Sequence, residues 1–252
     1  MNTHLIFPIG TSESCRYCST ALIHQGCHLT DHLSPDITHL LLDIPSFTPS
    51  KSQINESQLS ELLRRLPSKV TIIGGNLPES ICMDYQTLDL LKNEDFLAQN
   101  AAITAECAIQ VAAPYISTTF ADTPVLILGW GRIGKHLSNL LRSFGSPVTV
   151  AARNERDRAM LFSLGFNNVT FPLTSDTFKR HKLLFNTIPN PSFASEAISQ
   201  WKDGIKIDLA SYPGLIADGV IAARGLPGKY APESAGNLIA QTILKALKED
   251  MP

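Results

Sequence analysis

Residues 125–134 read VLILGWGRIG, and this stretch decides the fold of the second half of the chain. Four apolar residues predict a buried strand, and three glycines follow it in the pattern G-x-G-x-x-G. Between a strand and a helix, the first glycine permits a tight turn, the second lets backbone amides approach a pyrophosphate, and the third allows close helix packing. The stretch therefore predicts a dinucleotide site whose phosphates lie on the helix N-terminus. The predicted contacts are Gly129, Trp130, Gly131, Arg132, Ile133 and Gly134.

Short apolar runs alternate with helical patterns after this stretch, as a doubly wound parallel sheet requires. Right-handed crossovers place the strands in the order 3-2-1-4-5-6, which is the order of a Rossmann sheet. Strands are predicted at 125–128, 148–152, 169–171, 182–186, 205–209 and 220–223. Helices are predicted at 132–144, 155–164 and 232–248.

The whole chain divides into three predicted segments. Residues 1–92 predict a smaller α/β domain of flavodoxin or Rossmann type. Residues 93–121 predict a linking helix, because the segment lacks glycine and its first proline is Pro114. Residues 122–252 then form the dinucleotide-binding domain. The expected fold class is α/β, a doubly wound parallel Rossmann sheet with a smaller N-terminal α/β domain. In that smaller domain, strands are predicted at 5–7, 39–44 and 70–73, and helices at 14–25 and 55–66.

The end of the second Rossmann strand favours NADP(H) over NAD(H). An NAD enzyme usually places an acidic residue here to bind the ribose 2′-hydroxyl. This chain reads AARN at 151–154, which lacks that acid, and Arg153 offers a fork of donors suited to a 2′-phosphate. The alternative is a solvated arginine at a strand end, since Arg156 and Arg158 are equally available. The predicted contacts are Ala152, Arg153 and Asn154.

Two later loops fall at the carboxyl ends of the fourth and fifth strands, where ligands bind in open α/β sheets. In the first, NTIP at 186–189, Asn186 is expected to supply amide hydrogen bonds on the nicotinamide ribose side. In the second, DLAS at 208–211, Asp208 either accepts hydrogen bonds near the nicotinamide or holds a neighbouring loop. Both loops could instead be ordinary strand-ending turns. The predicted contacts are Asn186, Thr187, Ile188, Pro189, Asp208 and Ala210.

Charge and cysteine usage exclude several other classes of protein. The formal net charge is -2 and basic residues form no long run, so we expect no nucleic-acid partner. No segment approaches the ~18 apolar residues of a membrane helix, so we expect a soluble, cytoplasmic protein. The five cysteines are an odd number and do not suggest a disulfide framework. Cys15 and Cys18 form a C-x-x-C, but no second pair completes a zinc site, so no metal is expected.

A series of motifs runs in order through residues 95–248. They are TAE at 104–106, the glycine fingerprint, NTIP at 186–189, DLAS followed by Pro213-Gly214, and GLPG at 225–228 continuing through Ala231-Pro232 to Ala235-Gly236. In order and spacing these motifs resemble the A-subunit family of dipicolinate synthase. The resemblance implies an NADP-binding oxidoreductase of the lysine-pathway branch that oxidises dihydrodipicolinate to dipicolinate in spore-forming bacteria. It also implies a partner, the flavoprotein B subunit of dipicolinate synthase, which would carry FMN.

The N-terminal domain departs from the family pattern. Family members typically follow their first strand with a Gly-Gly-Asp-x-Arg turn, whereas this chain has GTSES at 10–14 with only Arg16 nearby. Cys107 also stands where a glycine is usual. These departures leave the predicted cofactor site intact and concentrate where a substrate would be selected.

Aromatising a dihydropyridine dicarboxylate removes a hydride equivalent and a proton, so the site needs a nicotinamide or flavin acceptor and a base. The candidate catalytic residues are Thr104, Glu106 and Ser211, and Glu106 is either a base or an exposed helix glutamate. Two other functions stay open. One is an NADP-dependent dehydrogenase of the shikimate or hydroxyacid type, and the other is a non-catalytic NADP-binding partner or sensor. A homo-oligomer is compatible with all three.

Overall fold

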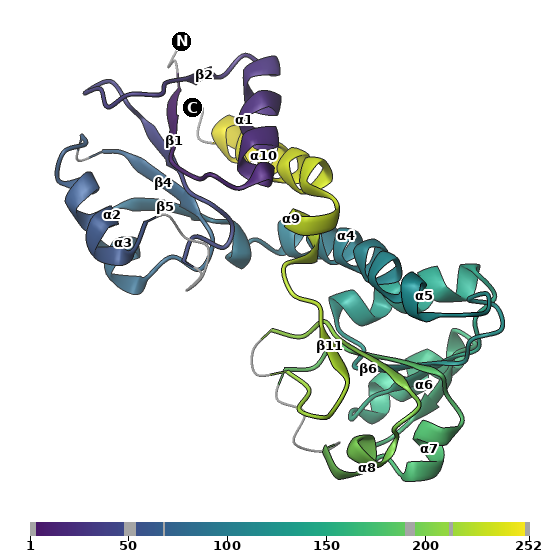
Figure 1. Ribbon diagram of the computed structural model, residues 1–252. Helices are drawn as coiled ribbons and strands as arrows, with labels where there is room; N and C mark the ends of the chain where they lie inside the picture. The colour runs from purple at the N-terminus through teal and green to yellow at the C-terminus, as the bar shows by residue number, and fades with distance from the viewer. Residues whose placement is uncertain (1–3, 48–53, 68, 190–194, 212–213, 250–252) are drawn as a thin grey trace. The chain divides into compact units, whose positions relative to one another are not determined.

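The computed structural model describes residues 4–47, 54–67, 69–189, 195–211 and 214–249. The chain forms two compact units, residues 1–100 with 227–252, and residues 101–226. Each unit is built on its own parallel β-sheet, with helices packed on it (Figure 1). The expected α/β class, a Rossmann sheet together with a smaller N-terminal sheet, is confirmed.

The first unit holds a five-stranded parallel sheet in the order β2-β1-β3-β4-β5. Its strands are β1 (Leu5–Pro8), β2 (His28–Leu29), β3 (His39–Leu41), β4 (Thr71–Gly74) and β5 (Gln86–Asp89). Its helices are α1 (Glu13–His24), α2 (Glu56–Leu63), α3 (Glu79–Asp84), the 3-10 helix η1 (Leu90–Lys92), the start of α4 (Glu94–Ala112), most of α9 (Leu226–Tyr230) and α10 (Pro232–Glu249). The predicted strands match β1, β3 and β4, whereas β2 and β5 had no predicted counterpart.

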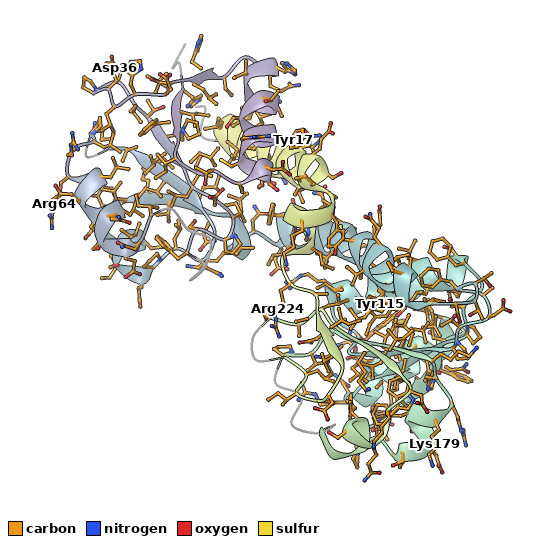
Figure 2. The ribbon with its side chains drawn as sticks, in the orientation of Figure 1. Tyr17, Asp36, Arg64, Tyr115, Lys179 and Arg224 are labelled. Carbon is orange, nitrogen blue, oxygen red and sulfur yellow. The ribbon has the colours of Figure 1, made fainter. Side chains whose placement is uncertain are left out.

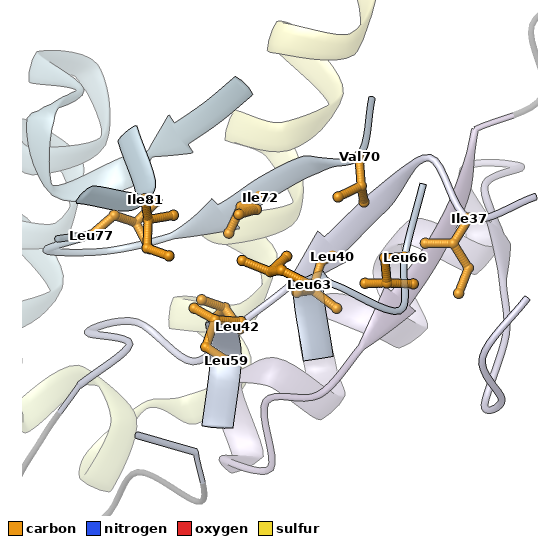
Figure 3. Close-up of a cluster of buried hydrophobic side chains, with 10 residues drawn as sticks. All are labelled: Ile37, Leu40, Leu42, Leu59, Leu63, Leu66, Val70, Ile72, Leu77 and Ile81. Carbon is orange, nitrogen blue, oxygen red and sulfur yellow. The ribbon is translucent and has the colours of Figure 1, made fainter. Parts of the chain in front are cut away.

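A cluster of buried aliphatic side chains forms the core beside α2 (Figure 3). Leu59 and Leu63 are one helical turn apart and therefore share the buried face of α2. The helix begins where Asn55 accepts a hydrogen bond from the amide of Gln58 at 2.9 Å, and the Gln58 side chain accepts one from the Asn55 amide at 2.9 Å. The cluster comprises Ile37, Leu40, Leu42, Leu59, Leu63, Leu66, Val70, Ile72, Leu77 and Ile81.

The final helix, α10, packs against α1 in the first unit. Gly236 makes this approach possible, because a Cβ atom there would lie 2.6 Å from the Ser14 carbonyl oxygen and 2.8 Å from the Cys18 amide nitrogen. Lys245 Nζ also donates to Asp95 Oδ2 at 2.6 Å. The helix expected at 232–248 is present, but it lies outside the Rossmann unit in which the segment 122–252 placed it. Helical periodicity identifies an apolar face without specifying which sheet covers that face.

The second unit holds a six-stranded parallel sheet in the order β11-β10-β9-β6-β7-β8. Counted from β6, this is the predicted Rossmann order 3-2-1-4-5-6. The order reverses between β6 and β9, and ligands of such sheets bind beyond the carboxyl ends of the strands at that reversal. The strands are β6 (Val125–Leu128), β7 (Val148–Ala151), β8 (Asn167–Val169), β9 (Leu183–Asn186), β10 (Ile205–Asp208) and β11 (Val220–Ala222).

Helices and buried side chains cover this second sheet. All four residues of β6 are fully buried, as expected for a central strand. The helices are the remainder of α4, η2 (Ala113–Tyr115), α5 (Arg132–Ser143), α6 (Glu155–Ser163), α7 (Ser175–Lys179) and α8 (Ser195–Gln200). No helix in the described ranges is both long enough and apolar enough to cross a membrane.

Candidate dinucleotide site

The turn between β6 and α5 requires glycine at two positions for steric reasons. Gly129 has a φ of 103°, which side-chain-bearing residues rarely adopt. A Cβ atom on Gly129 would lie 2.6 Å from the Thr187 hydroxyl oxygen and 2.8 Å from a carbon of Ile188. A Cβ atom on Gly134 would collide with the carbonyl oxygen of Gly129. The first and third glycines of the motif therefore let the strand, the helix and the neighbouring loop approach one another.

Gly131 has a different role, because it faces open space. A Cβ atom there would meet no heavy atom within 4 Å. Gly131 is the N-cap residue of α5 and has no side chain with which to cap the helix. The amides of the first helical turn have no partner within the helix, and the helix dipole makes this end partly positive. The turn can therefore take an anionic group such as a pyrophosphate.

The other three residues of the motif differ in exposure. Arg132 is exposed and Ile133 is half-buried. Trp130 is half-buried and meets the ring of Phe166 edge-on, with centroids 5.7 Å apart. Trp130 thus packs on a side chain of its own unit.

The end of β7 separates three arginines that the sequence could not distinguish. Arg158 Nη1 donates to the carbonyl oxygens of Ala152 at 2.9 Å and Arg153 at 2.6 Å, so Arg158 fixes the backbone here. Asn154 caps α6 by accepting from the Arg156 amide at 2.9 Å, and Ala152 is buried. Arg153 and Arg156 are exposed, and the described part of the chain offers neither guanidinium a hydrogen bond or ion pair. These two arginines are therefore the ones available to a 2′-phosphate.

The loop that follows β9 is held against the end of β6. The amide and the hydroxyl of Thr187 both donate to the Leu128 carbonyl oxygen, at 3.0 and 2.8 Å. Asn186 is fully buried, and its Nδ2 donates to the Ile188 carbonyl at 3.0 Å and to Asp208 Oδ1 at 2.8 Å. Both Nδ2 hydrogens of Asn186 are thereby used inside the protein. The side chain shapes the loop, whereas the sequence analysis expected it to donate to the cofactor.

Asp208, at the end of β10, takes the second of its two predicted roles. Its carboxylate is buried and accepts hydrogen bonds from Asn186, from the amides of Ala210 and Leu215, and from Arg224. It therefore holds neighbouring loops. Sequence reasoning missed Arg224, which belongs to no recognised motif and lies 16 residues beyond Asp208.

The candidate catalytic residues occupy unlike environments. Thr104 is buried in α4, Glu106 is exposed, and Ser211 is exposed after β10. Tyr212 and Pro213, which adjoin Ser211, lie outside the described residues. The exposure of Glu106 fits either of its two predicted readings, and no common site for the three residues follows from their positions.

The matching turn of the first unit, between β1 and α1, is closed by the protein's own carboxylate. Asp43 accepts from the amides of Thr11 and Ser12, each at 3.0 Å, and from the Ser12 hydroxyl at 2.5 Å. A Cβ atom on Gly10 would lie 2.8 Å from both the amide nitrogen and Oδ1 of Asp43. The position that an anion would take is thus filled. The sequence signal for Asp43 is an acidic residue directly after the apolar run at 40–42.

The described ranges contain no group of three or more histidine, cysteine, aspartate or glutamate side chains that could hold a metal. Cys15 and Cys18 of the C-x-x-C are buried on α1. Burial, assisted by the charge of Asp43, raises the pKa of the Cys15 thiol to about 12. Burial also raises the pKa of Cys18. Burial therefore favours the protonated thiol at both positions.

The sheet order and the glycine turn define the class of protein. This is a two-unit α/β chain with a Rossmann sheet of the kind found in dehydrogenases. Comparison with known proteins agrees with that class. The transhydrogenase of Sinorhizobium meliloti has the same fold, with a TM-score of 0.69 and 12% identity over 98% of this chain and 93% of that one.

The particular relatives are A subunits of dipicolinate synthase. The chain is 30% identical over 173 residues to the dipicolinate synthase A subunit of Bacillus subtilis strain 168, and the match covers 64% of this chain and 57% of that protein. The chain thus spans little more than half the length of this curated relative in the alignment. No family model matches the chain. The resemblance predicted from the motifs is confirmed.

Solved structures extend the fold likeness to the whole chain. The dipicolinate synthase A subunit of Bacillus halodurans aligns with a TM-score of 0.83 and 20% identity, covering 100% of this chain and 99% of that one. The corresponding Bacillus subtilis structure aligns with a TM-score of 0.79 and 21% identity, covering 99% of this chain and 97% of that one. The N-terminal unit therefore shares their fold although its first turn departs from the family pattern.

Proposed function

We propose that this chain is a cytoplasmic, NADP(H)-binding oxidoreductase that oxidises dihydrodipicolinate to dipicolinate with a flavoprotein partner, in sporulation. The observation that carries the proposal is the 30% identity to the A subunit of a dipicolinate synthase. The open turn at Gly131 supports the dinucleotide part independently, because it can take a pyrophosphate.

The cofactor would lie across the reversal between β6 and β9. Residues 129–134 would hold the pyrophosphate, and Arg153 with Arg156 would hold the 2′-phosphate. The loop at 186–189 would adjoin the nicotinamide ribose. When bound, the nicotinamide supplies a two-electron hydride carrier. The absence of an acidic residue at 151–154 supports NADP(H) over NAD(H), because no carboxylate repels the 2′-phosphate.

The substrate is a small dianion that must lose a hydride equivalent and a proton to become aromatic. Glu106 is the candidate for receiving the proton, since it is an exposed carboxylate in a motif shared with the family. Thr104 and Ser211 are hydroxyl candidates for binding a substrate carboxylate, and the burial of Thr104 makes Ser211 the more accessible of the two. FMN is assigned to the partner, the flavoprotein B subunit.

Dipicolinate formation from freshly generated dihydrodipicolinate tests the reaction. The purified chain is assayed alone and with a candidate flavoprotein partner, with NADP⁺ or NADPH supplied in parallel. We expect product that depends on this chain and increases with the partner. Product formation at the same rate without this chain would contradict the proposal.

A second candidate function is oxidation of another small acid. It is favoured by the β1–α1 turn, where GTSES replaces the family turn and Asp43 occupies the loop amides. An NAD-complexed D-isomer specific 2-hydroxyacid dehydrogenase of Lactobacillus delbrueckii also shares the fold, with a TM-score of 0.57. NADP-dependent turnover of hydroxy acids without any flavoprotein would favour this alternative.

A further inference from the structure

A buried carboxylate joins three loops at the carboxyl edge of the Rossmann sheet. The Asp208 side chain is 1% exposed. Its Oδ1 accepts from Asn186 Nδ2 at 2.8 Å and from the Ala210 amide at 3.4 Å, and its Oδ2 accepts from the Leu215 amide at 3.1 Å. Asn186 ends β9 and also donates to the Ile188 carbonyl in the loop after it, and Ala210 and Leu215 lie in the loop after β10, so Asp208 ties those two loops together.

Arg224 connects a third loop to Asp208, and its positive charge pairs with the negative charge of the carboxylate. It lies two residues after β11, and Figure 2 labels it on that segment. Its Nη2 donates to Asp208 Oδ2 at 2.8 Å, and its Nε donates to the Ala210 carbonyl oxygen at 3.0 Å. The fork of a guanidinium can make both contacts at once, whereas a lysine ammonium is a point charge on a flexible stem.

Gly214 gives independent evidence that the loop after β10 closes onto this ion pair. A Cβ atom at Gly214 would collide with Asp208 Oδ2 and with the Arg224 guanidinium. The backbone of the loop therefore approaches the pair more closely than any side-chain-bearing residue would allow.

The three loops belong to the half of the sheet that takes the second nucleotide. A doubly wound sheet binds a dinucleotide across its reversal, with one mononucleotide on each half. Here the turn at 129–134 and Arg153 serve the adenosine half, on β6 and β7. The loops after β9, β10 and β11 are left for the nicotinamide half.

We propose that Arg224 is a positioning residue for the nicotinamide half of the dinucleotide, acting through Asp208 and Asn186. This inference rests on the NADP(H) binding of the proposed function and not on the identity of the substrate. Removing the guanidinium leaves a buried carboxylate that lacks its counter-charge, so the loops around it must rearrange. The adenosine half of the site shares none of these hydrogen bonds.

The test compares two ligands in three variants of the full chain. NADPH contains both nucleotide halves, whereas 2′,5′-ADP lacks the nicotinamide half. The variants are Arg224→Gln, Arg224→Lys and the matched control Arg180→Gln, since Arg180 is an exposed arginine at the end of α7 in the same unit. Dissociation constants come from fluorescence or calorimetric titration, and each melting temperature is recorded.

We expect Arg224→Gln to weaken NADPH binding about tenfold, as loss of a charge-assisted hydrogen bond implies, while 2′,5′-ADP binding changes by less than about twofold. Arg224→Lys should fall between Arg224→Gln and the natural chain, and Arg180→Gln should match the natural chain. If Arg224→Gln does not fold, the same split between the two ligands is required of Arg224→Lys.

Equal weakening of both ligands in the Arg224 variants would reduce Arg224 to a general structural role and overturn the inference. Unchanged NADPH binding would overturn it as well. If the natural chain binds neither ligand, the cofactor proposal fails, and the inference about Arg224 fails as well because it depends on NADP(H) binding. The predicted split in a chain that forms no dipicolinate would support the inference and count only against the proposed reaction.

Discussion

The β1–α1 turn and the β6–α5 turn each connect a parallel strand to a helix, and they differ in what lies against the backbone amides of the turn. In the first unit, the Asp43 carboxylate accepts from the amides of Thr11 and Ser12. In the second unit, Gly131 faces open space and, as a glycine, supplies no side-chain cap to α5. The same kind of connection is thus closed by a carboxylate of the chain in one sheet, and we propose that it serves as an anion site in the other. A parallel strand followed by a helix does not by itself predict a nucleotide site, because the charge must be left for the ligand to supply.

The largest effect should follow from distorting the glycine turn of the second unit. In Gly134→Ala, the new methyl group collides with the Gly129 carbonyl and pushes the helix away from the strand. We expect NADPH binding to weaken at least about 100-fold, or about 2.7 kcal/mol, in titrations of the full chain. Gly228→Ala is the matched control, since a Cβ atom there makes only an ordinary contact of 3.6 Å with the Ser14 hydroxyl. If Gly134→Ala still binds NADPH tightly, the glycine turn of the second unit is not the nucleotide site.

The next effect should follow from removing the charge that closes the first turn. Asp43→Asn keeps the shape but weakens the hydrogen bonds from Thr11 and Ser12, at a cost of about 1–3 kcal/mol in the stability of the first unit. Amide hydrogen exchange should speed up at Thr11 and Ser12, while NADPH binding stays unchanged. The exposed Asp84→Asn variant controls for a simple loss of charge. Slow exchange in Asp43→Asn would show that the carboxylate does not hold the turn.

A smaller effect is expected from Arg153→Asp, which tests the preference for NADPH over NADH. Arg153→Asp replaces an exposed donor with a carboxylate that repels a 2′-phosphate. NADPH binding should weaken about tenfold while NADH binding weakens much less, because only NADPH carries the extra phosphate. Parallel titrations with both nucleotides check this. Equal losses for both would reject the assignment of Arg153.

The smallest effect concerns the cysteines that pack behind the closed turn. Burial and the charge of Asp43 raise the pKa of Cys15 to about 12, so at pH 9 the folded chain holds this residue mainly as the protonated thiol. Its alkylation by iodoacetamide should be much slower than that of half-buried Cys82, and should approach the Cys82 rate after unfolding in urea. Mass spectrometry of the digested chain measures both rates. Comparable rates in the folded protein would contradict the buried environment of Cys15.

The same raised pKa gives the stability a pH dependence of known sign. The folded chain holds the Cys15 proton more tightly than the unfolded chain, whose thiol titrates near 9.0. The stabilisation is therefore fully present below pH 9 and is lost as the pH rises toward 12. Urea unfolding across that range should show the free energy of unfolding falling with pH.

Particular residues show how far the sequence could predict this structure. The glycine motif and the apolar run before it gave the bounds of β6 and the order of the Rossmann strands, because their spacing is set by backbone geometry. The sequence analysis did not predict β2 and β5, because β2 (His28–Leu29) is very short and β5 (Gln86–Asp89) is largely polar. The sequence analysis did not predict that α10 packs in the first unit, because its partner, α1, lies more than 200 residues away in the sequence.

The candidate site was also predictable only in part. Local motifs identified the turn at 129–134 and the two loops after β9 and β10. They could not show that Arg158 is used by backbone carbonyls, that Asn186 is occupied internally, or that Arg224 pairs with Asp208. Those facts are side-chain hydrogen bonds between residues 5 to 22 positions apart, and they form only once the chain is folded, so no local motif contains them.

The most direct test of the central claim is the stoichiometry of NADPH binding by isothermal titration calorimetry. The account predicts a single site per chain, whose affinity falls at least about 100-fold in Gly134→Ala and is unchanged in Asp43→Asn. A second site, or a single site that survives Gly134→Ala and disappears in Asp43→Asn, would contradict it.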